Sequence, residues 1–374
     1  MLTLQISLLC QQQPLLAPPS AWIHHLGVGL RQTGPRTRFV DRSPEAPTAY
    51  LNLLASVLSS AALVCDMSAV SYAQCLRRYR DGTIWPSMGI TMAGVKRMQN
   101  IHYLLRRIAA AETKGSYVEC GVWRGGMSIF AKAALEAYSM QRAVYLCDSF
   151  QGLPSPRQGS LRADEVSYTS KEWNATLAQG VEHVAGNFRA YGVPLTGVNF
   201  VPGYFVKSLP GLRTQLQARG ERLSVLRLDG DIYDSTIDIL YNLYDLVEVG
   251  GFVVIDDFGW THGTTASSWP AKFGAKDAIL DFRALHGIED ALHVFRDIDG
   301  NGAWFSKARE VSLRRDDYIR SIANGDYGRM RPQPKLNSAD YARLMREYDK
   351  VALTRRERAG PIRARTVGKH HSMQ

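Results

Sequence analysis

Short apolar runs alternate with helix-length segments from Tyr117 onward, and this alternation restricts the fold more than any other feature of the chain. Seven runs occur, at residues 117–120, 143–148, 198–202, 223–229, 250–257, 291–298 and 302–308. Strands separated by helices are typical of a mostly parallel sheet with helices on both faces. The last two runs are separated by three residues, too few for a helical crossover, so we expect them to pair as an antiparallel hairpin. The sequence therefore predicts an α/β fold with a seven-stranded sheet that ends in this hairpin.

The remaining regions differ in composition, and the 374 residues suffice for one main domain with extensions. Residues 1–47 are rich in Pro, Gln and Arg without a sustained period, which predicts a disordered arm. Residues 48–112 carry apolar side chains at helical spacing, which predicts an N-terminal helical region; they include Leu51, Leu54, Leu58, Met98, Ile101, Leu105 and Ile108. We assign residues 113–308 to the sheet domain. Residues 309–374 form a basic C-terminal extension, with a short helix expected around residues 316–322.

Charge and hydropathy limit the partners of the chain. Half of the formal net charge of +10 lies in residues 354–374, and no nucleic-acid motif occurs, so we expect no specific nucleic-acid partner. The apolar stretch at residues 51–65 is shorter than the ~20 residues that cross a membrane, so we expect an amphipathic helix and no membrane span. The five cysteines form no CxxC pair, and no Lys or Arg precedes Arg31 as the flank of a signal peptide. These features favour a reducing compartment and a cytoplasmic protein.

A turn with three glycines follows the first run. Gly121, Gly125 and Gly126 allow close backbone approach, and the helix that begins after them offers free N–H groups to a carboxylate or phosphate. Their spacing differs from the dinucleotide fingerprint G-x-G-x-x-G and from the phosphate loop. The second run ends at Asp148, which either accepts hydrogen bonds from the hydroxyls of a ribose or caps a turn. Together, the turn and Asp148 favour a site for an adenosine-containing ligand.

Acidic residues end the fourth and fifth runs, at Asp229 and at Asp256 and Asp257. If these strands are neighbours, about 4.8 Å apart, the three carboxylates converge and hold a cation, for which magnesium is suited. The alternative is that acids here cap the following helices. His262, in the loop after these acids, is a candidate general base, with an ordinary exposed loop histidine as the alternative.

These motifs resemble those of the macrocin O-methyltransferase family, S-adenosylmethionine-dependent enzymes that methylate sugar hydroxyls of macrolide antibiotics. The resemblance covers about residues 49–307 and is carried by "ECGVWRGGMSIF", "CDSFQGLPSP", "LRLDGDIYDST" and "VEVGGFVVIDDF". It implies a class I methyltransferase, Rossmann-like sheet with the N-terminal helical region closing over the site.

The resemblance also implies roles for individual residues. The methionine part of the cofactor would contact Glu119, Gly121, Gly125 and Gly126. The ribose would contact Asp148 with the adjacent Ser149, and the adenine would lie near Gly203 and Tyr204. The acids Asp229, Asp256 and Asp257 match the magnesium ligands of the family, and Asp229 is also a cofactor contact and a candidate to accept the hydroxyl proton.

The acceptor is less defined than the donor. Ile90 stands where the family often has a histidine, and residues 259–273 form a longer loop than usual. We expect magnesium-dependent O-methylation of a sugar or other small molecule with vicinal hydroxyls, since two neighbouring hydroxyls chelate a metal best; homo-oligomer formation is left open. Two alternatives remain: a nicotinamide-dependent oxidoreductase on the same sheet, and a family member that binds cofactor or a partner without methyl transfer.

Overall fold

The computed structural model describes residues 46–62, 72–84, 86, 88–155, 157, 171–258, 274–295 and 302–324. The chain divides into two compact units, at residues 1–40 and 41–374, and the described residues all belong to the second. His262, the loop at residues 259–273, the tail at residues 354–374 and most of the predicted arm lie outside them.

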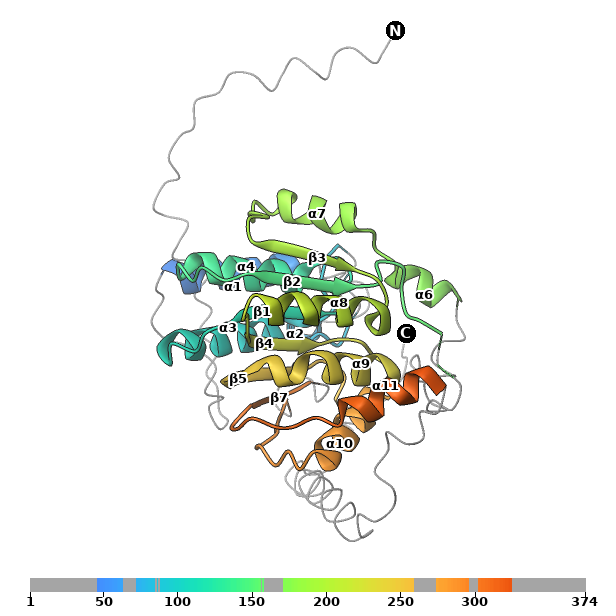
Figure 1. Cartoon of the computed structure of the whole chain (residues 1–374). Coiled ribbons are helices and arrows are strands. Elements are labelled where there is room, and N and C mark those ends of the chain that lie inside the picture. Colours follow the sequence, from blue (N-terminus) through green and yellow to red (C-terminus); the bar gives the residue numbers. More distant parts are fainter. Residues whose placement is uncertain are drawn as a thin grey trace, which may run out of the picture. The chain divides into compact units, whose positions relative to one another are not determined.

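A seven-stranded sheet forms the centre of this unit (Figure 1). Its strands are β1 (Ser116–Cys120), β2 (Val144–Asp148), β3 (Val198–Pro202), β4 (Leu223–Leu228), β5 (Val247–Ile255), β6 (His293–Val294) and β7 (Ala303–Ser306). They lie in the order β3-β2-β1-β4-β5-β7-β6. The pairs from β3 to β5 are parallel, β7 is antiparallel to β5, and β6 is antiparallel to β7. The predicted fold class, including the C-terminal hairpin, is confirmed.

Helices cover both faces because alternate residues of each strand point to opposite sides. Tyr117 of β1 and Val225 of β4 contribute to one core, whereas their neighbours Val118 and Leu226 contribute to the other. The first core is covered by α1 (Ala46–Leu58), α2 (Tyr72–Asp81), α3 (Gly94–Ala110), α4 (Gly126–Ala137) and α7 (Val181–Ala190). The second is covered by α8 (Phe205–Ala218), α9 (Tyr233–Leu243), α10 (Ala275–Leu285) and α11 (Arg315–Asn324). A short helix, α6 (Lys171–Leu177), precedes α7.

The N-terminal helices belong to the core of the sheet. The predicted apolar positions are buried and lie in the first core; they are Leu51, Leu54, Leu58, Met98, Ile101, Leu105 and Ile108. Helix α1 packs on α3 and α4, and α3 reaches β5. Helix α1 begins at Ala46, so the last two residues assigned to the arm are helical. Helix α11 matches the helix expected around residues 316–322.

Two smaller expectations need correction. Strand β5 begins at Val247 rather than at residue 250, because Gly250, with a φ of +86°, accommodates a change of register against β4. Cys120 and Cys147 are free and buried as expected, but Cys75 of α2 is disulfide-bonded, so the cysteines do not by themselves favour a reducing compartment. Among the described helices, none has the length and hydrophobicity needed to cross a membrane.

Candidate active site

The parallel strands β1 to β5 end at one edge of the sheet. The order in which the chain adds strands reverses between β1 and β4. From β1 the sheet continues through β2 and β3 on one side and through β4 and β5 on the other. In open α/β sheets the crevice at such a switch point, beyond the carboxyl ends of the strands, is where ligands bind. The residues that follow β1 to β5 are therefore the ones to compare with the predicted site.

The glycine turn after β1 lies against the backbone of β4. Gly121 has a φ of +93°, and a Cβ atom added to it would lie 1.7 Å from the carbonyl oxygen of Asp229. Its N–H donates to the carbonyl of Cys147 at 2.8 Å, while the N–H of Asp229 donates to the carbonyl of Cys120, also at 2.8 Å. Only glycine allows this approach, so the turn closes directly over the β1–β4 switch point.

The two later glycines start helix α4. Gly125 has a φ of +84° and is the residue before the helix, and the N–H of Gly126 donates to the carbonyl of Ile90 at 3.1 Å. A Cβ atom at Gly126 would lie 2.5 Å from that carbonyl oxygen. The segment around Ile90 is thus seated on the glycine turn, and the Ile90 side chain is buried in the first core.

Asp148 holds the glycine turn through backbone hydrogen bonds. Its Oδ2 accepts from the N–H groups of Val122 at 2.7 Å and Trp123 at 3.4 Å, and its Oδ1 accepts from the N–H of Phe150 at 2.8 Å. Burial raises the pKa of the carboxyl, and these hydrogen bonds oppose that rise. The neighbouring Ser149 donates to the carbonyl of Gly152 at 2.5 Å. The turn-capping alternative therefore has direct support, and a ribose would have to share the carboxylate with these amides.

The loop after β3 adjoins Asp148. Gly203, with a φ of +129°, donates its N–H to the carbonyl of Asp148 at 2.9 Å, and Tyr204 is the residue before helix α8. The predicted cofactor residues from the ends of β1, β2 and β3 are thus brought to one edge of the sheet. Glu119 is different, because it lies within β1 and is 1% exposed.

A buried arginine links three acids of the site. Arg227 of β4, 1% exposed, contacts Glu119 at 2.9 Å, Asp229 at 2.8 Å and Asp256 at 2.5 Å. Glu119 also accepts hydrogen bonds from the hydroxyls of Ser128 at 2.6 Å and Tyr117 at 3.2 Å. Burial raises the pKa of Glu119 to about 7, although Arg227 opposes the rise. In this arrangement Glu119 holds strand β1 to β4.

Asp256 is paired with arginines on both carboxylate oxygens. Its Oδ1 contacts Arg227, and its Oδ2 pairs with Arg97 of α3. Burial would raise the pKa of Asp256, but Arg227 and Arg97 hold it below the usual value. Its side chain is therefore directed to the α3 face of the sheet.

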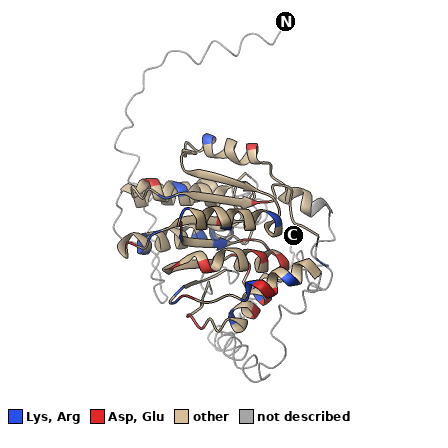
Figure 2. Cartoon of the chain, in the orientation of Figure 1, with Lys and Arg blue, Asp and Glu red and all other residues tan. Residues whose placement is uncertain are grey.

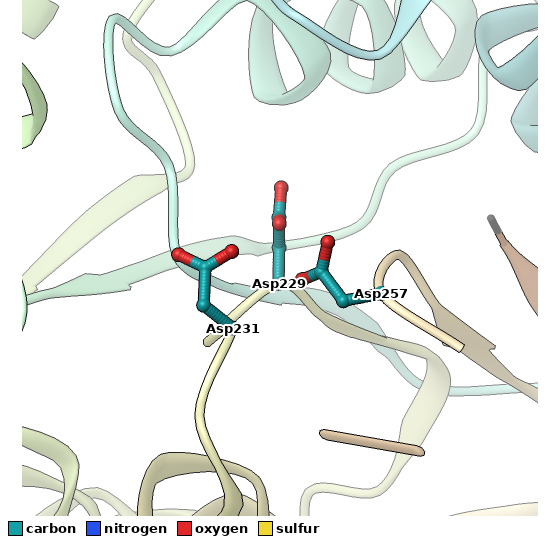
Figure 3. A group of neighbouring side chains, drawn as sticks. All are labelled: Asp229, Asp231 and Asp257. Carbon is teal, nitrogen blue, oxygen red and sulfur yellow. The ribbon is translucent and has the colours of Figure 1, made fainter. Parts of the chain in front are cut away.

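A second group of three acids, which shares Asp229 with the first, lies beside the glycine turn (Figure 3). Carboxylate oxygens of Asp229, Asp231 and Asp257 lie within 4.8 Å of one another, and the side chains point into the same space. The structure brings together Asp229 and Asp257 as predicted, but the third acid of the group is Asp231 instead of Asp256. Asp256 and Asp257 directly follow the last residue of β5, and Arg227 and Arg97 hold the Asp256 carboxylate away from this group.

The charges of this acidic group are uncompensated at Asp257. Its buried Oδ2 has no hydrogen-bond partner among the described residues. Burial raises its pKa well above the usual value, and the carboxylates of Asp231 and Asp229 add to the rise. Burial also raises the pKa of Asp229 to about 6. A divalent cation with oxygen ligands fits a group of three carboxylates in which one buried oxygen has no partner among the described residues.

Sequence reasoning did not single out Arg97 and Arg227, nor the place of Asp231 in the acidic group. Arg227 had a detectable signal, because a charged residue inside the apolar run "LSVLRLD" has to be paired when buried. Glu119 and Arg227 are also direct partners in the β1–β4 register. Arg97 had no such signal, because it lies 159 residues from Asp256 in the sequence.

The family model of macrocin O-methyltransferase (TylF) matches residues 45–307, most of the chain. The chain belongs to the macrocin O-methyltransferase family. It is an S-adenosylmethionine-dependent O-methyltransferase, and the relatives it resembles are O-methyltransferases. The nicotinamide-dependent alternative has no support.

Curated relatives of this family are similar over most of their length. The chain is 40% identical to an 8-demethyl-8-(2,3-dimethoxy-alpha-L-rhamnosyl)-tetracenomycin-C 4'-O-methyltransferase of Streptomyces olivaceus, over 60% of this chain and 78% of the relative. It is 34% identical to a demethyldecarbamoylnovobiocin O-methyltransferase of Streptomyces niveus, over 70% of this chain and 94% of the relative. The solved structure of the O-methyltransferase NovP is also 34% identical, with a TM-score of 0.59, and the match covers 70% of this chain and all of that one.

Proposed function

We propose that the protein methylates a hydroxyl of a sugar, or of another small molecule with vicinal hydroxyls, with a magnesium ion held by Asp229, Asp231 and Asp257. The observation that carries the proposal is the position of the acidic group. Asp229, a member of it, is the residue whose backbone contacts Gly121. A donor in the glycine turn and an acceptor at the acids would thus be neighbours. Relatives whose names specify a methylated sugar position include the mycinamicin III 3''-O-methyltransferase of Micromonospora griseorubida.

The reaction moves a methyl group from the sulfonium of the donor to the acceptor oxygen. The S–CH₃ bond breaks with its electron pair remaining on sulfur, the O–CH₃ bond forms, and the hydroxyl proton passes to a base. The glycine turn and the N-terminus of α4 would hold the charged methionine part, and the Asp148 end of β2 would hold the ribose. Orientation contributes much of the rate, since attack requires the reacting atoms to begin about 3–3.5 Å apart.

Asp229 is the proposed proton acceptor, and it also faces the cation site. A carboxylate at this point attracts the hydroxyl hydrogen and orients the oxygen. Arg227 fixes the Asp229 carboxylate from the opposite side at 2.8 Å. When bound, the ion lowers the pKa of the hydroxyl and supplies positive charge among the acids.

An assay with labelled methyl donor tests the acceptor class. The purified protein is given a panel of glycosides with free neighbouring hydroxyls and a matched panel in which one hydroxyl of each pair is already methylated. We expect transfer to the first panel and a rate at least about tenfold lower on the second, because the second lacks the bidentate pair. Equal rates on both panels would contradict the vicinal-hydroxyl requirement. Donor binding without any transfer would favour the alternative of a family member that no longer methylates.

Magnesium titration by calorimetry tests the ligands. We expect Asp257→Asn and Asp231→Asn to weaken magnesium binding at least about tenfold, since each loses a charged oxygen ligand. Asp256→Asn is the matched control, because both of its oxygens are paired with arginines. If Asp256→Asn removes magnesium binding and Asp231→Asn does not, the result would support the ligands expected from the sequence, Asp229, Asp256 and Asp257. Wild-type protein that binds no magnesium would contradict the metal role altogether.

A further inference from the structure

Helix α11 lies beyond the residues that match the family model, and it packs on α9. The match ends at residue 307, and α11 begins at Arg315. Tyr318, 3% exposed, stacks on Tyr241 of α9 with ring centroids 4.7 Å apart and planes at 3°. Arg315 donates to the carbonyl of Tyr241 at 3.3 Å and to the side-chain oxygen of Asn242 at 3.1 Å. Figure 2 shows acidic residues on α9 and both acidic and basic residues on α11.

The Tyr318 hydroxyl reaches a buried acid in α9. It donates to Oδ1 of Asp238 at 2.7 Å and accepts from the amide of Asn242 at 3.3 Å. The other carboxylate oxygen of Asp238 pairs with the guanidinium of Arg157. The Asp238 side chain is 3% exposed. Its two carboxylate oxygens contact one residue of α11 and one residue outside both helices.

Arg157 belongs to the segment that leaves β2 at Asp148. Its backbone N–H donates to Oδ2 of Asp234 at 2.8 Å, and its guanidinium donates to the carbonyl of Asp234 at 3.3 Å. Asp234 lies in the first turn of α9, directly after the Asp229–Asp231 loop. In the strand order β1, which leads into the glycine turn, lies between β2, which ends at Asp148, and β4, whose following loop leads to Asp234 and its partner Arg157.

We propose that Tyr318 is a positioning residue, which through Asp238 holds Arg157 and so fixes the C-terminal side of the segment at residues 149–155 beside the donor site. A neutral hydroxyl that donates to Asp238 leaves the second carboxylate oxygen directed at the guanidinium. Without it, Asp238 loses one of its hydrogen-bond partners, and the carboxylate that pairs with Arg157 is less well fixed. The inference rests on the proposed donor site at this edge of the sheet. It gives the chain beyond residue 307 a role in the reaction.

Tyr318→Phe tests the link because it keeps the ring stack and removes only the hydroxyl. We expect the variant to raise the dissociation constant for S-adenosylhomocysteine, and the KM for the donor, about fivefold, with kcat changed less than about twofold, because a hydrogen bond to a charged group is lost away from the reacting atoms. Tyr241→Phe is the matched control. Its hydroxyl has no hydrogen-bond partner among the described residues, and the stack is the same.

Two further measurements separate positioning from simple stability. Arg157→Ala should weaken binding to a similar extent, and the double variant Arg157→Ala with Tyr318→Phe should be no weaker than Arg157→Ala alone. Hydrogen exchange of the peptide from Ser149 to Arg157 should rise in Tyr318→Phe and not in Tyr241→Phe. Additive losses, or unchanged exchange and affinity in Tyr318→Phe, would overturn the inference. If the wild type did not bind S-adenosylhomocysteine, the proposed donor site would fail, whatever the exchange data showed.

Discussion

Gly121 is the residue whose backbone contact closes the donor site over the switch point. We expect Gly121→Ala to destabilise the fold by at least about 2 kcal/mol and to abolish binding of S-adenosylhomocysteine, because the added methyl would lie 1.7 Å from the carbonyl oxygen of Asp229. Thermal unfolding and calorimetry measure the two effects. Gly192→Ala is the control, since Gly192 also has a positive φ, of +66°, but nothing lies within 4 Å of its added methyl. Equal effects of both substitutions would mean that backbone strain, and not the contact with β4, explains the loss.

At the same scale, the sequence indicated which acids follow the strands but not the directions in which their side chains point. Asp229 and Asp257 follow from their positions at the ends of neighbouring strands. Asp256 lies apart from the group because Arg227 and Arg97 take both of its carboxylate oxygens. Phe252 and Val254 lie in the first core, so the alternation along β5 places Asp256 on the same side, where Arg97 of α3 is available. The partner is on a distant helix, and no local pattern indicates it.

At the scale of elements, Arg227 joins β1, β4 and β5 through side chains. We expect Arg227→Met to destabilise the metal-free protein by about 3–5 kcal/mol, because it leaves buried carboxylates without a positive partner. Chemical denaturation measures the change. Adding Glu119→Gln should restore part of the loss, since one of the unpaired charges is then removed.

Arg320→Met provides the comparison for this prediction. Its side chain is 66% exposed and pairs with Asp317 within α11, so we expect a change within about 0.5 kcal/mol. An Arg227→Met protein as stable as the wild type would show that the three acids are not held by Arg227.

The elements themselves were largely predictable, because period and length identify them. Apolar runs of strand length indicated all seven strands, and the three-residue connection between the last two indicated the hairpin. The start of β5 was missed because "LVEV", at residues 246–249, reads as the end of a helix, while the structure places Val247 to Val249 in the strand. Pairing with β4 decides this boundary, and pairing is not visible in local sequence.

At the scale of the whole molecule, the pH dependence of stability should carry a contribution from Asp238. Burial raises its pKa to about 7, although Arg157 and Tyr318 oppose the rise and Asp234 adds to it. The unfolded value is about 3.9, so between about pH 4 and pH 7 the folded protein keeps a proton that the unfolded chain has lost. Stability from this group therefore falls as pH rises through that window, by at most about 1.4 kcal/mol per pH unit.

Unfolding free energies of the wild type and Asp238→Asn, measured from pH 4 to pH 8, isolate this contribution. We expect the wild type to lose stability relative to the variant as pH rises, since asparagine does not titrate. Glu182→Gln, at a carboxylate whose side chain is 92% exposed, should give a flat difference. A flat difference for Asp238→Asn as well would mean that the acid is ionised throughout this range in the folded protein.

The role of residues 48–112 is the part of the molecule that sequence described least well. Periodicity correctly placed helical faces at Leu54 and Ile101, but it gives no information on the partner of an apolar face. In the structure those faces share a core with α4 and with strands β1 to β5 and β7. The division into a cap region and a sheet domain stays a prediction, as does closure over the site.

The pairing of Arg97 with Asp256 has a consequence for how the protein is made. The two residues are 159 positions apart, so at about 5–20 residues per second the ribosome needs roughly 8–30 s after Arg97 to synthesise its partner. Throughout that interval α3, with Met98 and Ile101 in its apolar face, lacks the contact with β5. The side of α3 that finally packs on β5 therefore gets its cover only after α1, α2 and α4, the helices that α3 also contacts, are already synthesised.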